Sequence, residues 1–159
     1  MAGIWYKEYE QGRRFILKIR PGERVGEQLV AFARESGLKN AVIISAVGSL
    51  KNVRFRGIKT GAKRPITAPR MQVHEVEGPL ELCGLEGNLF PDESGSVDCH
   101  LHIMVAKSSG EVLGGHLFDA EVFASCEIIL TEVLVAGVER HASKSGGVAT
   151  IYIDEESLP

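Results

Sequence analysis

Cysteine pairs, membrane-length apolar runs and an excess of basic charge are all missing from this sequence. Its three cysteines, Cys83, Cys99 and Cys126, are odd in number and form no CxxC pair. We therefore expect buried free thiols, with neither a disulfide nor a cysteine-rich metal site. No apolar run approaches the roughly 20 residues that span a membrane, and the first residues lack the apolar region of a signal peptide. These absences predict a protein of the reducing cytoplasm without a membrane partner.

The charge balance argues against a general affinity for nucleic acid, but the charges are unevenly distributed. The chain has 159 residues, enough for one domain over residues 1–159, and its net charge is -3. Between Ser36 and His74 there is no acidic residue. Four basic residues of this segment are candidates for binding an anion or a partner: Arg54, Arg56, Lys63 and Arg64. The alternative is a solvated basic loop that pairs with acidic neighbours.

The hydrophobic pattern predicts one clear helix. Val25, Leu29 and Ala33 fall on one stripe of a helix over residues 23–36, which Gly37 ends. Residues 118–132 could be read as a second helix, but the β-branched residues that follow Cys126 favour a strand.

Most of the remaining chain predicts strands separated by turns. Strands are expected over residues 13–20, 41–47, 53–58, 71–77, 80–89, 97–106, 111–117, 125–135 and 148–153. Gly48-Ser49 is expected to form a turn, and residues 60–70 and 141–147 are expected to be links. The sum is a two-layer α+β fold, a mostly antiparallel sheet flanked by one or two helices.

Three of the five histidines lie close together in the sequence. Residues two apart in a strand leave the same face, so His100 and His102 should lie side by side, with Leu101, Ile103 and Val105 on the core face. A hairpin after Val105 would return His116 to the same place. Three neutral imidazoles with an open fourth position are typical of a zinc site.

The residues alone leave a second interpretation of this cluster open. Gly114 and Gly115 precede His116, and glycine permits the close backbone approach that would bring the third imidazole in. The same glycines could mark only a bend, with His100 and His102 as structural or surface residues.

Four stretches, taken together, resemble a known family. They are the segments Gly48-Ser49-Leu50-Lys51-Asn52-Val53-Arg54-Phe55-Arg56, Gly78-Pro79-Leu80-Glu81-Leu82-Cys83-Gly84-Leu85-Glu86-Gly87-Asn88, His100-Leu101-His102 and Gly110-Glu111-Val112-Leu113-Gly114-Gly115-His116-Leu117. In this order they resemble the plants-and-prokaryotes-conserved (PPC) domain in its prokaryotic single-domain form, over a core of about residues 10–136.

The resemblance implies a fold, an assembly and a set of ligands. The implied fold is an antiparallel sheet flanked by helices, assembled as a homotrimer, and the implied ligands of a divalent metal, most simply zinc, are His100, His102 and His116. Plant relatives bind AT-rich DNA through AT-hooks with an Arg-Gly-Arg-Pro core. This chain has Ala62-Lys63-Arg64-Pro65 instead, without the central glycine, so hook-type entry into a minor groove is not expected.

Three functions follow as hypotheses. The first is a trimeric metal-binding domain with a DNA-associated or regulatory role. The second is a metal-dependent enzyme of the hydrolase type that acts on a small anionic substrate, with Glu81 or Glu75 as general base and Arg54 or Arg56 holding the anion. The third is a protein-interaction module without chemistry.

Overall fold

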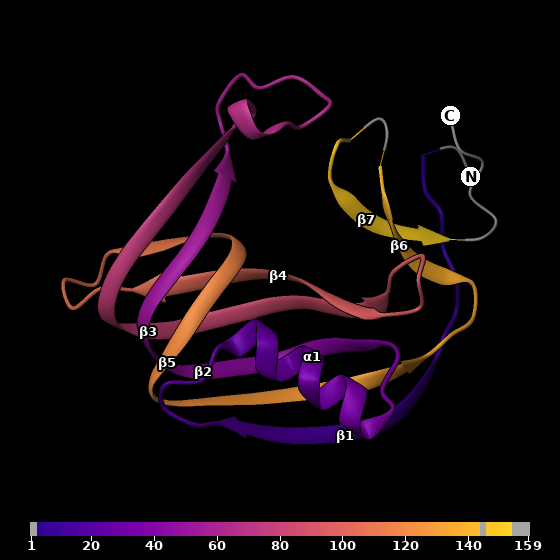
Figure 1. Ribbon diagram of the computed structural model, residues 1–159, viewed down its shortest axis with the longest axis horizontal. Helices are drawn as coiled ribbons and strands as arrows, with labels where there is room; N and C mark the ends of the chain where they lie inside the picture. The colour runs from indigo at the N-terminus through magenta and orange to yellow at the C-terminus, as the bar shows by residue number, and fades with distance from the viewer. Residues whose placement is uncertain (1–2, 144–145, 154–159) are drawn as a thin grey trace.

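The chain folds into long, bent antiparallel strands with one α-helix against one face of the sheet (Figure 1). The structure is a computed structural model that describes residues 3–143 and 146–153. The main sheet has the strand order β1-β5-β2-β3-β4, and β6 and β7 form a separate hairpin. The elements are β1 (Glu10–Ile19), α1 (Val25–Ser36), β2 (Ala41–Ile58), the 3₁₀ turn η1 (Ala68–Arg70), β3 (Met71–Pro91), β4 (Val97–Ala106), β5 (Val112–Leu134), β6 (Val138–Ala142) and β7 (Ala149–Ile153).

One end of the main sheet closes on itself. β4 pairs with β3 along its length, and its second half, from His102 to Ala106, also pairs with the beginning of β5. Because β5 pairs with β2 and β2 with β3, these four strands form a closed ring. Closure leaves no free edge on β4 over this stretch and fixes which residues of β4 and β5 face each other.

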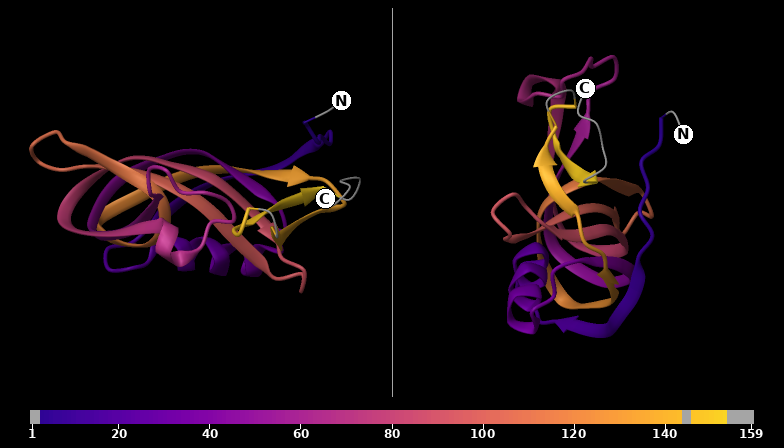
Figure 2. Two further views of the ribbon diagram at one scale, coloured as in Figure 1. Left: turned by 90° about the horizontal axis from the view of Figure 1, so that it is seen from above. Right: turned by 90° about the vertical axis from the view of Figure 1, so that its right-hand side faces the viewer.

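The core lies between α1 and the sheet. Val25, Leu29 and Ala33 of α1 are fully buried, and Phe32 contacts Phe15 of β1 edge to face at 5.0 Å between ring centroids. Seen from the side, α1 runs along the strands on a single face of the sheet (Figure 2). The two-layer α+β architecture predicted from the sequence is therefore confirmed.

The helix ends as its sequence predicts. Gly37 follows the last turn with φ of 66°, a left-handed conformation that glycine adopts without steric cost. Its backbone N–H bonds to Arg34, and that of Leu38 bonds to Ala33. The helix begins at Val25, two residues later than predicted, and η1 is the only other helical segment in the described residues.

The predicted turn at Gly48-Ser49 is wrong, because β2 runs through it. A Cβ atom on Gly48 would lie 2.2 Å from the carbonyl oxygen of Ser125, so glycine lets β2 and β5 come close here instead of reversing the chain. β3 likewise runs through Gly78-Pro79, where the register with β2 shifts between Leu50 and Asn52. A bulge tolerates proline because no ladder hydrogen bond is needed there.

Two further expectations need correction. The predicted link over residues 141–147 begins too early, since His141 and Ala142 belong to β6 and pair with β7; residues 144–145 lie outside the described residues. Of the three cysteines expected to be buried, Cys126 is buried and Cys99 half-buried, but Cys83 is exposed because it faces outward from β3. None of the helices in the described residues is long and apolar enough to cross a membrane.

Shortening a side chain to alanine should have different effects on the two faces of β4. Leu101 is 2% exposed, whereas Met104, on the histidine face, is 45% exposed. We expect Leu101→Ala to lower the free energy of unfolding by about 2–5 kcal/mol, because it leaves a cavity in a packed core. Met104→Ala is the matched control and should lower the free energy of unfolding far less. Urea denaturation of both variants measures the difference, and equal losses would contradict this assignment of faces.

Candidate metal centre

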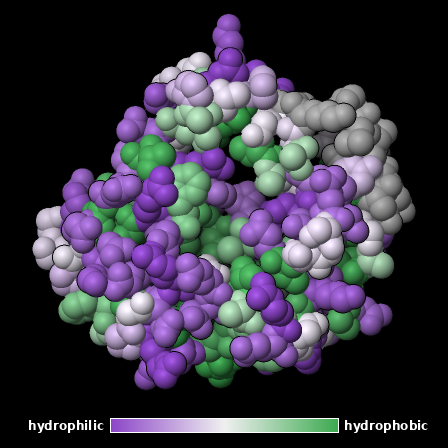
Figure 3. Space-filling view, viewed as in Figure 1, coloured by the Kyte–Doolittle hydropathy of each residue, from purple (hydrophilic) through white to green (hydrophobic). Residues whose placement is uncertain are grey.

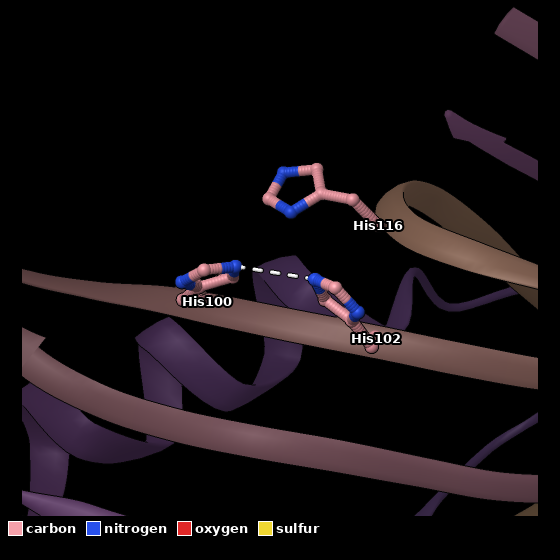
Figure 4. A group of neighbouring side chains, drawn as sticks. All are labelled: His100, His102 and His116. Carbon is pink, nitrogen blue, oxygen red and sulfur yellow. Dashed lines mark hydrogen bonds between the residues drawn. The ribbon is translucent and has the colours of Figure 1, made fainter. Parts of the chain in front are cut away.

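Three imidazoles converge on one face of the closed end of the sheet (Figure 4). His100 and His102 project from the same face of β4, as their spacing predicts. His116 faces them from β5, where it is the direct antiparallel partner of His102. One ring nitrogen from each of the three lies within 4.8 Å of the other two. The structure therefore brings together the three histidines singled out from the sequence.

Gly114 and Gly115 explain how β5 comes close enough to position His116. A Cβ atom on Gly114 would lie 2.3 Å from the carbonyl oxygen of Ile103 on β4. A Cβ atom on Gly115 would lie 2.4 Å from the carbonyl oxygen of Arg56 on β2. The two glycines thus permit tight packing on both sides of β5, and they do not merely mark a bend.

The spacing of the ring nitrogens fits a small cation. Nε2 of His100 lies 3.3 Å from Nε2 of His102. Nitrogens bound to one tetrahedral zinc ion at about 2.0–2.1 Å would be roughly 3.3 Å apart. Only a modest inward movement of His116 is then needed for a three-nitrogen ligand set that leaves a fourth position open.

The surroundings of His100 and His116 favour the neutral imidazole, the form that binds metal. Burial lowers the pKa of His116 to about 4, with a further contribution from the positive charge of Arg56. Burial also lowers the pKa of His100, and the charge of Arg140 adds to this effect. Neutral rings present free lone pairs at neutral pH, so the donor set fits an imidazole-binding ion.

A pocket of about 390 Å³ opens beside the three histidines. Arg56 lines it from β2, Ile66 from the loop that follows β2, and Val148 and Ala149 from the place where β7 begins in the β6–β7 hairpin. The loop and the hairpin meet where the backbone N–H of Ile66 donates to the carbonyl of Gly146 at 2.7 Å. Figure 3 shows the hollow between these two segments.

The four basic candidates separate into two groups. Arg56 is the direct strand partner of His116. Its Cζ atom lies 5.2 Å from the ring centroid of Phe118, and its Nη1 atom lies 2.8 Å from Sδ of Met71. Arg54 contacts the same Phe118 ring but is paired with Glu75 at 3.2 Å. Lys63 and Arg64 are exposed on the loop after β2 and are not among the residues that line the pocket.

Neither predicted general base adjoins the imidazoles. Glu75 is largely exposed and occupied by Arg54. Glu81 is the partner of Ala106, four residues beyond His102 along β4, a separation of about 13 Å in an extended strand. The strand register, which the sequence pattern did not fix, explains where both carboxylates lie.

Three residues that the sequence analysis missed lie close to the histidines. Glu86 and Asn88 on β3 are the direct partners of His102 and His100, and so share their face. Pairing the residues on either side of the turn at Asp92, one by one, would have placed both opposite the histidines. Arg140 reaches Asn88 from β6, with Nη2 donating to Oδ1 at 2.7 Å, and no local pattern marked it.

A family model described as the Plants and Prokaryotes Conserved (PCC) domain matches residues 6–134. The chain belongs to this family. It is the family that the four sequence motifs resemble, under the name PPC. The match includes all three histidines but ends before β6, so Arg140 lies outside it.

Relatives of this PCC domain include proteins of different architecture. The chain is 28% identical over 144 residues to the bifunctional protein GlmU of Synechococcus sp. (strain JA-3-3Ab), covering 90% of this chain and 21% of that protein. It is 27% identical over 118 residues to AT-hook motif nuclear-localized protein 29 of Arabidopsis thaliana, covering 74% of this chain and 38% of the plant protein. The chain therefore spans only about a fifth and under two fifths of these relatives.

Solved structures share the fold over nearly the whole chain. A metal-containing protein from Archaeoglobus fulgidus superposes with a TM-score of 0.81 at 29% identity, covering 94% of this chain and 99% of that one. A plant- and prokaryote-conserved protein from Pyrococcus horikoshii gives a TM-score of 0.80 at 26% identity, covering 98% and 100%.

The close packing at Gly115 gives a test of how the PCC domain positions His116. We expect Gly115→Ala to lower the melting temperature, because the new methyl group would clash with the backbone of β2. Gly57→Ala, on β2 itself, is the control, since a Cβ atom there meets nothing within 4 Å. Thermal unfolding followed by circular dichroism compares the two, and an unchanged melting temperature for Gly115→Ala would contradict the packing described.

Proposed function

We propose that this PCC domain binds one divalent metal ion, zinc, through His100, His102 and His116. The observation that carries the proposal is the convergence of three ring nitrogens within 4.8 Å of one another. The metal-containing protein of Archaeoglobus fulgidus, similar over nearly its entire length, supports it. A zinc ion in such a site supplies a Lewis acid and lowers the pKa of a bound water to about 7.

The arrangement favours metal binding over the alternative functions. A hydrolase needs a general base within hydrogen-bond reach of the reacting group. Both predicted bases, Glu75 and Glu81, are displaced from the site, which leaves the exposed Glu86, opposite His102, to take that role. A DNA-associated role, suggested by the name of the plant relative, would depend on the exposed basic residues between Ser36 and His74, Lys63 and Arg64 among them. On a chain of net charge -3 they are weak support for binding to phosphates.

Metal content tests the ligand assignment. We expect wild-type protein, incubated with zinc and desalted, to retain about one ion per chain. His102→Ala should lose the ion while keeping its fold, because His102 is exposed and the core is on the other face of β4. His74→Ala is the control, since His74 stacks on Phe55, away from the cluster. Elemental analysis by mass spectrometry measures the ion, and retention of zinc by both His102→Ala and His100→Ala would refute the site.

We further propose that the chain assembles as a homotrimer through the sheet face opposite α1. Four large apolar side chains are exposed there, with Ile16 84% and Ile129 44% exposed as direct strand partners, beside Ile44 and Val47 of β2. An apolar sheet face of this kind is typical of a surface that a second copy covers. The resemblance to the PPC family supports three copies.

Light scattering tests the assembly. We expect a mass three times the 17.3 kDa of one chain, with or without a chelator. Ile16→Glu should dissociate the trimer, because it places a charge in the apolar contact. Val112→Glu, at an exposed site at the beginning of β5, is the control and should leave the mass unchanged. A monomeric wild-type protein would contradict the proposal.

A further inference from the structure

A buried arginine beside the histidines is only partly satisfied. Arg140 is 4% exposed, and Nη2 of its guanidinium donates to Asn88 Oδ1 at 2.7 Å. Nε and Nη1 are buried and have no hydrogen-bond partner in the described part of the chain. The nearest carboxylate oxygen paired with it, Asp98 Oδ2, is 4.0 Å from Nε on a side chain that is 58% exposed. A buried guanidinium with free donors is costly, so these donors indicate a ligand.

Strand register places this guanidinium next to the metal centre. Asn88, which accepts from Arg140, is the direct partner of His100 on β3. Asp98 is two residues before His100 on β4 and so leaves the same face. Arg140 therefore lies beside His100, at the opposite end of the cluster from Arg56, which is the partner of His116. The charge of Arg140 also contributes to the lowered pKa values of His100 and His116.

Charge balance indicates the sign of the ligand. The three imidazoles bring no negative charge, and two guanidinium groups flank them. The neighbouring carboxylates, Glu86 opposite His102 and Asp98 beside His100, are exposed and at most offset these two guanidinium charges. A divalent cation added to this site raises the local positive charge further, and in a half-buried pocket the repulsion is only weakly screened. An anion in the fourth position of the metal would relieve that repulsion and use the free donors of Arg140.

The pocket indicates the size and chemistry of the anion. Its volume of about 390 Å³ suits a small molecule, and Ile58, Ile66 and Val148 give it apolar walls. Guanidinium donors match the planar oxygens of a carboxylate, and an oxygen of the same group can bind zinc. Arg56 is among the residues that line the pocket, and Arg140 is not. An anion with a short apolar body would contact Arg56 and the apolar walls from the pocket, and it would reach the buried donors of Arg140 at the His100 end of the cluster.

We propose that Arg140, with Arg56, binds a small organic carboxylate that also takes the open position of the metal. This inference rests on the metal site proposed above and adds its ligand class. Arg140 is then a specificity-determining residue contributed by β6, outside the part of the chain that carries the histidines.

Cobalt-substituted protein tests the proposal without an activity assay, because the visible spectrum of Co²⁺ reports its ligands. We expect acetate to change the spectrum of the wild-type protein saturably. Arg140→Met should raise the dissociation constant of acetate at least tenfold while cobalt content stays the same. Arg140→Lys should lose less of the affinity for acetate, since it keeps the charge but not the planar donors. Arg34→Met, exposed on α1, is the matched control and should match wild type.

The outcomes separate the two proposals. No cobalt uptake by wild-type protein would refute the metal site, and the carboxylate site with it. Cobalt uptake without any response to acetate, a response only to inorganic phosphate, or equal affinity in Arg140→Met would overturn the carboxylate proposal alone. Should both Arg140 variants fail to fold, nuclear magnetic resonance of the zinc-loaded wild-type protein decides: the Nε–H signal of Arg140 should shift on saturation with acetate, and an unchanged signal would overturn the proposal.

Discussion

The pairing of β4 with the beginning of β5 is the constraint on which the rest of the structure depends. It closes the ring of β5, β2, β3 and β4, and it sets His102 directly opposite His116. The pairing in turn requires Gly114 and Gly115, since side chains there would collide with the backbones of β4 and β2. The same two glycines therefore serve the fold and the candidate metal centre.

The alternation of side chains along β4 separates the packed core from the candidate metal centre. Leu101, Ile103 and Val105 are at most 2% exposed and pack into the core, while His100 and His102 face the pocket. Cys99 follows the core side, and burial raises the pKa of its thiol to about 11. A thiol that stays protonated is a poor metal ligand, so the strand offers its imidazoles on one face and inert groups on the other.

How far the sequence predicted the structure depends on how local each feature is. The stripe of α1 and the two faces of β4 follow from periods of 3.6 and 2, and the stop at Gly37 follows from the left-handed conformation that glycine tolerates. All three features are found in the structure. Breaks at Gly48 and at Gly78-Pro79 were expected because both look like turns, yet both became irregular points within long strands that curve around the closed end. Residue type alone does not distinguish a turn from a bulge, since neighbouring strands decide between them.

Contacts between distant segments were beyond prediction for the same reason. His116 could be linked to His102 because a short hairpin joins their strands, whereas Arg140 reaches Asn88 from 52 residues away. The placement of Glu75 and Glu81 failed on register. Both lie in a strand, as predicted, but on the single strand β3 and not on two neighbouring strands, and the distance of each carboxylate from the histidines depends on which residue it faces.

The donor set and its charged neighbours also limit which ion the site can select. Calcium and magnesium need several oxygen ligands, and the described cluster offers nitrogen alone. Zinc and the other later transition metals bind imidazole well enough to tolerate two flanking guanidinium groups, which would repel a hard cation held by electrostatics. The cluster itself contains no carboxylate, and the neighbouring Glu86 and Asp98 are exposed, so the charge of a bound metal ion would be neutralised best by an anion that enters from the pocket. The proposed metal and anion would therefore bind cooperatively, because each reduces the electrostatic cost of the other.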